Sequence, residues 1–365
     1  MVSMPVNKAK YKIIKQEIKN NILSARYKIG DRLPTESDFM AEFDVSRFTI
    51  RRAIDELVNE NFVRRVQGNG MYIKDWHKGN KADEDLQTIA VITTHVADYI
   101  FPNIINAIDK VISDAGYSLI LANTHNDPKR ERDNLLRLLK LKPSAWIIEP
   151  TQSAVNRENL DLYQQIKKLN VPAVFINSSY PGIGFPCLKT DDRGSLSELT
   201  NYLFSIGHRR IIGVFQIDDI QGVERMKGFT DAYLGHPYFS DRLTTIMYKS
   251  TDNYDEIFSR ITNFYNNQTI DKPDAIICYN DQLAIALIDN LKEQGWKIPE
   301  DISIIGFDDY NISRYITPTL TTLSHPKSQM GRDAGKMILN LIDNKPVKSI
   351  TYYPELVLRK SVRPI

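Results

Sequence analysis

Cysteine is nearly absent from this chain of 365 residues, in which only Cys187 and Cys278 occur. Their spacing suits neither a disulfide framework nor a zinc site. Long apolar runs are also missing, and no stretch of about 18 apolar residues could span a bilayer. The first residues are polar and rich in lysine, without the apolar core of a signal peptide. We therefore expect a cytoplasmic protein that makes no membrane contact.

Excess charge of either sign is small as well, because the net charge is only +2. It is unevenly placed. Residues 1–75 contain 14 Lys and Arg against 10 Asp and Glu, a net charge of +4, which leaves −2 for the rest of the chain. The length exceeds that of one compact core, so we expect two or three domains, with the basic excess in a small N-terminal one.

The N-terminal domain begins with a pattern typical of helices. Ile14, Ile18 and Ile22 recur at every fourth residue among Lys and Glu, which predicts an amphipathic first helix. A second helix is predicted after Thr35, which can cap its N-terminus with Asp38 three residues further on.

A third helix is predicted to start after Ser46, which can cap it. The residues of this helix that we expect to face the core are Ile50, Ile54, Leu57 and Val58. This pattern leaves Arg47, Thr49 and Arg51 exposed in the opening turns. A short helix followed by a helix with exposed Arg is typical of a helix-turn-helix, whose recognition helix lies in the major groove. There Arg can bond guanine in bidentate fashion or bind phosphate.

A hairpin is predicted after the third helix. Residues 62–66 and 71–73 are apolar or β-prone, and they flank Gly68, Asn69 and Gly70. Glycine allows positive φ and a close approach to phosphate or to the minor groove, so Gly68 and Gly70 are candidate DNA contacts in a wing.

The motifs of residues 8–75 resemble the winged helix-turn-helix of the GntR family. The matching segments are 33–36, 45–53 and 68–70, with Met71 where a small β-branched residue is common. The resemblance implies that Glu36, Arg47, Arg51 and Gln67 contact bases or backbone and that Lys10 lies near phosphate. Ser46 and Thr49 complete the candidate DNA-binding residues. For Glu36 an alternative stays open, a favourable position at the N-terminal dipole of the second helix.

The remainder alternates between short apolar runs and helical patterns. Strands are predicted at 88–92, 118–122, 146–149, 173–176, 210–215, 245–248, 275–279 and 303–307, with helices at 131–141, 196–206, 222–234 and 283–294. This alternation predicts an α/β protein with doubly wound parallel sheets. Residues 88–365 are too many for one such sheet, so we expect two lobes. A connector at 76–87 joins them to the N-terminal domain.

Polar and aromatic residues follow the predicted strands, where doubly wound sheets bind ligands. Tyr99, Phe101 and Glu149 are candidates from this placement. Such groups suit a small, neutral, hydroxyl-rich ligand such as a sugar. His95 and His125 lack metal-ligand spacing, and we expect no metal or cofactor.

Residues 88–365 also resemble the sensing core of LacI-type repressors and periplasmic sugar-binding proteins. The matching segments are 207–211, 225–229, 280–283, 301–309, 320–322 and 356–361. The resemblance implies that Arg225, Asn280 and Asp308 bind the effector. Other interpretations remain: a surface position for Arg225, a helix N-cap for Asn280 and a turn cap for Asp308.

A GntR-type head on a LacI-type core resembles the arabinose repressors of Gram-positive bacteria. That resemblance implies a homodimeric repressor of L-arabinose use, which binds a roughly palindromic operator in double-stranded DNA and releases it when the sugar binds. Three alternatives remain: the same regulator with another sugar, a phosphorylated sugar or a purine; a sugar-binding transport protein; and an aminotransferase-like regulator carrying pyridoxal phosphate. The last would need a longer chain and a cofactor lysine motif, so we expect no enzyme.

Overall fold

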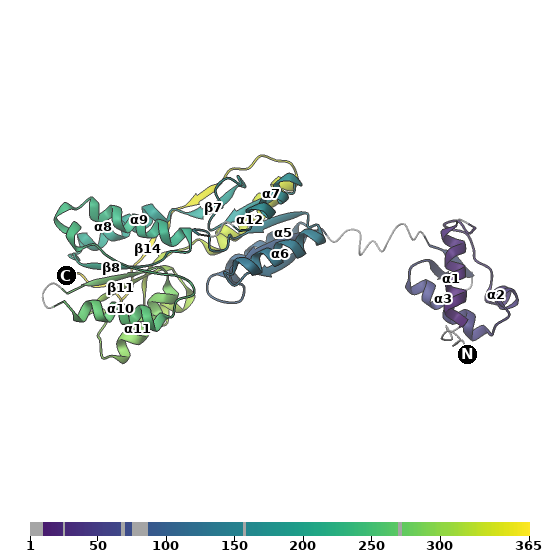
Figure 1. Cartoon of the computed structure of the whole chain (residues 1–365), viewed down its shortest axis with the longest axis horizontal. Coiled ribbons are helices and arrows are strands. Elements are labelled where there is room, and N and C mark those ends of the chain that lie inside the picture. The colour runs from purple at the N-terminus through teal and green to yellow at the C-terminus, as the bar shows by residue number, and fades with distance from the viewer. Residues whose placement is uncertain (1–9, 25, 67–69, 75–86, 156–157, 269–271) are drawn as a thin grey trace, which may run out of the picture. The chain divides into compact units, whose positions relative to one another are not determined.

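The computed structural model describes residues 10–24, 26–66, 70–74, 87–155, 158–268 and 272–365. The chain divides into two compact units, Met1–Leu86 and Gln87–Ile365, called here the head and the effector unit (Figure 1). The predicted connector at 76–87 lies outside the described residues except for Gln87. No helix among the described residues is long and apolar enough to cross a membrane.

The head contains three helices and a hairpin. Its elements are α1 (Lys10–Leu23), α2 (Glu36–Phe43), α3 (Arg47–Asn59), β1 (Val63–Val66) and β2 (Gly70–Ile73). Ile14, Ile18 and Ile22 are buried in its core, as their spacing predicts, and they pack with Ile50 and Ile54 of α3. The winged helix-turn-helix predicted from the motifs is therefore present.

The two predicted helix caps differ. Thr35 and Asp38 form the capping box: the backbone N–H of Thr35 donates to Asp38 Oδ2 at 2.8 Å, and that of Asp38 donates to Thr35 Oγ1 at 3.3 Å. Ser46 occupies the N-cap position of α3, but its side chain makes no capping bond. Its hydroxyl lies 3.0 Å from the Thr49 hydroxyl, and two such groups satisfy one another. The expectation of a serine cap was wrong.

The hairpin is antiparallel, with Val63 opposite Ile73 and Val66 opposite Gly70. Gly70 has a φ of +107°, and a Cβ atom there would lie 2.9 Å from the guanidinium of Arg32, so this position requires glycine. Met71 is buried in the core of the head, so the departure from the family pattern is accommodated. Gln67 and Gly68 lie outside the described residues.

The effector unit consists of two lobes, each with a six-stranded sheet. In lobe 1 the strand order is β13-β7-β6-β5-β3-β4. Its strands are β3 (Thr88–Thr93), β4 (Ser118–Asn123), β5 (Ala145–Ile148), β6 (Ala173–Ile176), β7 (Cys187–Thr190) and β13 (Ile350–Tyr352), and its helices are α5 (Phe101–Asp114), α6 (Pro128–Leu141), α7 (Leu160–Lys168) and α12 (Lys327–Ile342). Ile89 and Val91 of β3 pack towards α5 and α12, whereas Ala90 and Ile92 pack towards α6 and α7, so helices cover both faces.

Lobe 2 repeats this design with the order β14-β12-β11-β10-β8-β9. Its strands are β8 (Ile211–Gln216), β9 (Thr244–Tyr248), β10 (Ala275–Cys278), β11 (Ser303–Asp308), β12 (Thr321–Ser324) and β14 (Leu356–Val357), and its helices are α8 (Asp192–Ser205), α9 (Ile220–Leu234), α10 (Tyr254–Asn266) and α11 (Asp281–Glu293). All eight predicted strands are present, each end within one residue. The chain passes between the lobes three times: after β7, after β12 and after β13.

Candidate functional site

A cavity of about 610 Å³ lies in the effector unit and is lined by residues of both lobes. It sits at the carboxyl ends of the strands, where open parallel sheets bind ligands. All six residues expected at the effector site line it: Tyr99, Phe101, Glu149, Arg225, Asn280 and Asp308. The structure thus brings together side chains that are up to about two hundred residues apart in the sequence.

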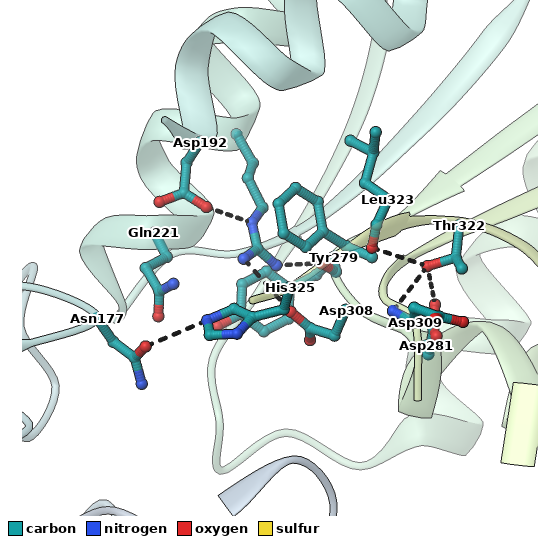
Figure 2. Close-up of polar contacts among 12 residues, drawn as sticks. Asn177, Asp192, Gln221, Tyr279, Asp281, Asp308, Asp309, Thr322, Leu323 and His325 are labelled. Carbon is teal, nitrogen blue, oxygen red and sulfur yellow. Dashed lines mark hydrogen bonds and ion pairs between the residues drawn. The ribbon is translucent and has the colours of Figure 1, made fainter. Parts of the chain in front are cut away.

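Arg225 forms the centre of the lobe 2 wall. Its side chain is only 2% exposed, which rules out the alternative of a surface position. Nε donates to Asp192 Oδ1 at 2.9 Å and Nη1 donates to the carbonyl of Tyr279 at 2.6 Å (Figure 2). The guanidinium carbon lies 3.5 Å from the centre of the Phe307 ring. Burial raises the pKa of Asp192 to about 6, against the opposing effect of Arg225.

Asp308 stands at the end of β11, and one of its carboxylate oxygens is 3.9 Å from Nη2 of Arg225. Tyr99 of lobe 1 donates its hydroxyl hydrogen to the other oxygen, and the Tyr99 oxygen also lies 3.1 Å from the carbonyl of Phe307. The carboxylate therefore faces Tyr99 and Arg225 in the cavity wall, which does not fit the alternative of a turn cap. Tyr99 connects the two lobes at this point.

Glu149 forms much of the opposite wall. One carboxylate oxygen accepts from the backbone N–H and the hydroxyl of Thr94, at 2.8 and 2.7 Å, and the other accepts from Asn177 Nδ2 at 2.6 Å. Burial raises the pKa of Glu149 to about 7, although these bonds oppose the rise. Phe101, the first residue of α5, provides an aromatic surface beside the ring of His95, with 5.3 Å between ring centres.

Asn280 has a structural role in addition to its place in the cavity wall. Its Oδ1 accepts from the backbone N–H of Leu283 at 2.9 Å and so caps α11. The helix-cap interpretation was therefore correct, and it does not remove Asn280 from the lining.

Sequence reasoning did not select several residues that shape the cavity, above all Asp219. Its Oδ2 accepts from the hydroxyl of Tyr279 at 2.5 Å, and its Oδ1 accepts from the hydroxyl of Ser153, in lobe 1, at 2.8 Å. Another bond between the lobes joins Asn126 Nδ2 to Ser250 Oγ at 3.0 Å. The lobes are thus bonded to each other at several lining residues, among them Tyr99, Asp219 and Asn126. The only signal in the sequence was that Asp219 and Asn126 follow strands β8 and β4 closely.

The charge of the lining disfavours an anionic ligand. Its carboxylates are Asp98, Asp127, Glu149, Asp219 and Asp308, whereas Arg225 is the only Lys or Arg among the described lining residues. Arg225 is already paired with Asp192. No group of three or more metal-binding side chains is found in the described part of the chain.

In the head, α3 exposes the arginines that the motif predicts. The side chains of Arg47 and Arg51 are 66% and 59% exposed, and both approach Glu36, which is 17% exposed. The distances from their Nε atoms to Glu36 are 3.1 and 3.4 Å. Partial burial opposes ionisation of Glu36, but these bonds outweigh it and lower its pKa. Glu36 therefore orients both arginines, a contact that its helix-dipole position alone does not explain.

The other predicted DNA-binding residues of the head are placed as follows. Lys10, Ser46 and Gly70 are exposed, and Thr49 is half-buried beside Ser46. Phe48, which sequence reasoning did not select, is 74% exposed between Arg47 and Thr49. An exposed phenylalanine in the first turn of a recognition helix is able to contact the methyl group of thymine.

Comparison with known proteins agrees with both units. Models of bacterial regulatory proteins of the gntR family and of the periplasmic binding protein-like domain match residues 10–73 and 200–362. The arabinose metabolism transcriptional repressor of Geobacillus stearothermophilus is 37% identical over 361 residues, which cover 98% of each chain. The chain belongs to this family of repressors. It is a regulator of transcription and not an enzyme.

Two further proteins illustrate the family and its fold. An arabinose metabolism transcriptional repressor of Halalkalibacterium halodurans is 34% identical over 96% of each chain. A solved LacI family transcriptional regulator of Enterococcus faecium, with bound ribose, has a TM-score of 0.65 and 24% identity, and the match covers 76% of this repressor and 99% of that chain. The second likeness shows the fold alone, and it confirms the two-lobed architecture predicted for the effector unit.

Proposed function

We propose that this repressor binds the operators of L-arabinose utilisation genes and leaves them when L-arabinose occupies the cavity between its lobes. The observation that carries the proposal is the composition of the cavity, where aromatic rings and hydrogen-bonding groups of both lobes surround the space. Among the lining residues that the structure describes, Arg225 is the single Lys or Arg, and it is already paired. The names of the similar repressors point to arabinose. Because operator DNA lies in the cytoplasm, the proposal also places the protein there.

The proposed ligand contacts follow from the walls. Arg225, Asp308 and Asn280 offer bonds from lobe 2, and Glu149 offers them from lobe 1, while Phe101 covers an apolar ring face. Carboxylates, amides and guanidinium groups can each bond adjacent hydroxyls. A ligand that bonds both lobes stabilises the closed arrangement, since only there are all its contacts made.

Release of DNA is proposed to follow from linkage between the two units. The protein acts as a homodimer, with heads of residues 1–75 tethered through residues 76–87 to effector units of residues 88–365. Arg47 and Arg51, with Lys10, Glu36, Ser46, Thr49 and the wing residues Gln67, Gly68 and Gly70, contact the half-sites. Closure of the lobes changes the spacing of the heads, and a coupling of ~1–3 kcal/mol per site lowers operator occupancy.

Other effectors fit the cavity less well. A phosphorylated sugar needs cationic or backbone donors for its phosphate, whereas the described part of the lining contains five carboxylates and, of Lys and Arg, only Arg225. The sugar's hydroxyl pattern distinguishes L-arabinose from other neutral pentoses and hexoses, and a purine differs from all of them by its lack of hydroxyls. The test therefore compares these classes directly.

Isothermal calorimetry of the full chain tests the proposal with L-arabinose, D-xylose, D-ribose, D-galactose, ribose 5-phosphate and guanine. We expect L-arabinose to bind most tightly and to bind more weakly when operator DNA is present, because linkage is reciprocal. Equal sugar affinity with and without operator would remove the release mechanism. Tightest binding of another ligand in the panel would remove L-arabinose as the effector.

A further inference from the structure

Lys327 connects the two lobes beside the cavity without lining it. It is the first residue of α12, which begins just after the second passage of the chain between the lobes, from β12 to α12. Its Nζ donates to the backbone carbonyl of Asp308 and, at 2.9 Å, to that of Asp309. An ammonium group of lobe 1 thus binds the carboxyl end of a central strand of lobe 2.

The backbone that Lys327 binds is unusual. Asp308 and Asp309 have φ values of +103° and +45°, so two consecutive non-glycine residues adopt conformations that L-residues rarely take. Such a corner persists only where its surroundings fix it. Asp309 is fixed through its carboxylate, which accepts from Arg314 at 3.1 Å and from Arg359 at 2.5 Å. For Asp308, the backbone carbonyl accepts from Lys327 and, at 3.4 Å, from the N–H of His325.

This corner determines where the Asp308 carboxylate points. Asp308 is the last residue of β11, and its side chain reaches Tyr99 and Arg225 at the cavity wall. A change of φ at Asp308 would rotate the carboxylate away from both partners. Such a rotation would also move the backbone carbonyls that Lys327 bonds. These bonds therefore keep the Asp308 carboxylate pointing towards the cavity wall.

The helix that carries Lys327 also borders the other wall. α12 lies along α5 (Figure 1). The first residue of α5, Phe101, lines the cavity. Ala334 and Met337 of α12 share a buried cluster with Ile104 and Ile108 of α5. One rigid element of lobe 1 therefore supports the aromatic surface and, through a single side chain, the acidic group of lobe 2.

We propose that Lys327 is a positioning residue for effector binding, which fixes the left-handed corner at Asp308 so that its carboxylate meets the ligand when the lobes are closed. This inference rests on the proposed function of the cavity, because it concerns the same ligand. Lys327 itself makes no ligand contact. It acts through the two carbonyls of Asp308 and Asp309.

The test compares Lys327→Met, which keeps the length of the side chain and removes its donors, with Lys327→Arg, which retains donors. Lys336→Met, at an exposed position on the same helix, is the matched control. Calorimetry of the full chain with L-arabinose is expected to show a loss of about 10-fold or more for Lys327→Met, and about 3-fold or less for Lys327→Arg and Lys336→Met. Operator binding without sugar is measured for each variant as a check that the fold survives.

Two results would overturn the inference while leaving the proposed function intact. One is wild-type sugar affinity in Lys327→Met. The other is an equal loss in Lys327→Met and Lys327→Arg together with a lower melting temperature in both, since that pattern belongs to general structural damage. If the wild-type chain binds no sugar of the panel, the proposed function fails, and the inference fails with it.

Discussion

The carboxyl groups of the head and of the effector unit's interior have pKa values displaced in opposite directions. In the head, Glu36 and Glu60 lie near the surface beside Arg or Lys, and the hydrogen bonds from these partners lower their pKa values. In the effector unit, Glu149, Asp192 and Asp281 are buried, and burial raises their pKa values to about 7, 6 and 7. The carboxyl groups of the head thus lie near water, whereas these three carboxyl groups of the effector unit are shielded from it.

This difference corresponds to the two partners. DNA is a dense polyanion, and exposed arginines that release its counterions give binding that depends strongly on salt. A sugar is neutral, so its contacts gain strength from being buried and lose little to salt. Substitutions in the buried cavity wall and on the exposed surface of the head should therefore have different effects, and they follow in order of expected size.

The largest effect is expected at Arg225. Lys is a suitable replacement because it keeps the buried charge beside Asp192 and Asp308, whereas Met removes that charge. Breaking a buried ion pair costs about 3–5 kcal/mol of folding free energy, so Arg225→Met should be much less stable than the wild type. We expect about 100-fold weaker L-arabinose binding for Arg225→Met and about 10-fold for Arg225→Lys, measured by calorimetry.

The control for this change is Arg137→Met on α6, an exposed arginine of the same unit. It should leave sugar affinity and melting temperature as in the wild type. Folded Arg225→Lys should remain on operator DNA at sugar concentrations that release the wild type. Sugar binding that is unaffected in Arg225→Lys would show that Arg225 supports the wall without meeting the ligand.

The next effect is expected at Arg51, on the exposed side of the comparison. Arg51→Ala should lower operator affinity about 10-fold, because a good arginine contact to a base is worth ~1–3 kcal/mol of discrimination. If Arg51 contacts phosphate, the slope of log affinity against log salt should decrease by about 1. Fluorescence anisotropy with a labelled operator across a salt series measures both quantities.

The melting temperature should hardly change in Arg51→Ala, since exposed ion pairs such as Arg51 with Glu36 contribute little to stability. Arg137→Ala again provides a control in which one exposed positive charge is lost outside the head. A large fall in stability of Arg51→Ala, or equal operator affinity in the two variants, would contradict the role of Arg51 in DNA binding.

The smallest effect is a pH dependence at Glu149. Its pKa is about 7 in the folded protein against an ordinary 4.5, so the folded state favours the protonated form. The protonated carboxyl of Glu149 therefore stabilises the folded protein relative to the ionised one. This stabilisation is present at low pH and is lost as the pH rises to about 7. Glu149→Gln cannot ionise. Its melting temperature relative to the wild type should therefore rise between pH 5 and 8, by roughly 2 to 4 °C in differential scanning calorimetry.

Glu36→Gln should show the opposite sign, because the pKa of Glu36 is lowered. The contribution of Glu36 is present at neutral pH and is lost on acidification, so this variant should be less stable than the wild type at pH 7 and match it in acid. Curves of the same sign for the two variants would break the comparison between buried and exposed carboxyl groups.

The sequence predicted the head well because its signals are local. The isoleucines of α1, the capping box of Thr35 and the register of Arg47 and Arg51 each depend on residues within one or two turns. The contacts of Glu36 with these arginines were not predictable in this way. They join residues 11 and 15 positions apart through the packing of two helices.

In the effector unit, the predicted strands located Tyr99, Phe101 and Glu149, because the carboxyl ends of parallel strands meet at one edge. The other three lining residues came from the resemblance to LacI-type repressors. Asp192 could not be found so, because it meets Arg225 only through the packing of α8 against α9. Nor could Asp219 and Ser153, because they bond to each other across the two lobes. The strands β7, β12 and β13 were missed because they are short and partly polar, and β14 because it has only two residues. Lys327 was missed because its partners depend on the second passage of the chain between the lobes.

The late position of β13 and β14 has a consequence for synthesis on the ribosome. The head is complete at Ile73, whereas each lobe receives its last strand only from residues 350–357. A nascent chain therefore contains the whole head while the sheets of both lobes of the effector unit still lack an edge strand. During translation, the DNA-binding unit can therefore fold before the unit that responds to the effector is complete.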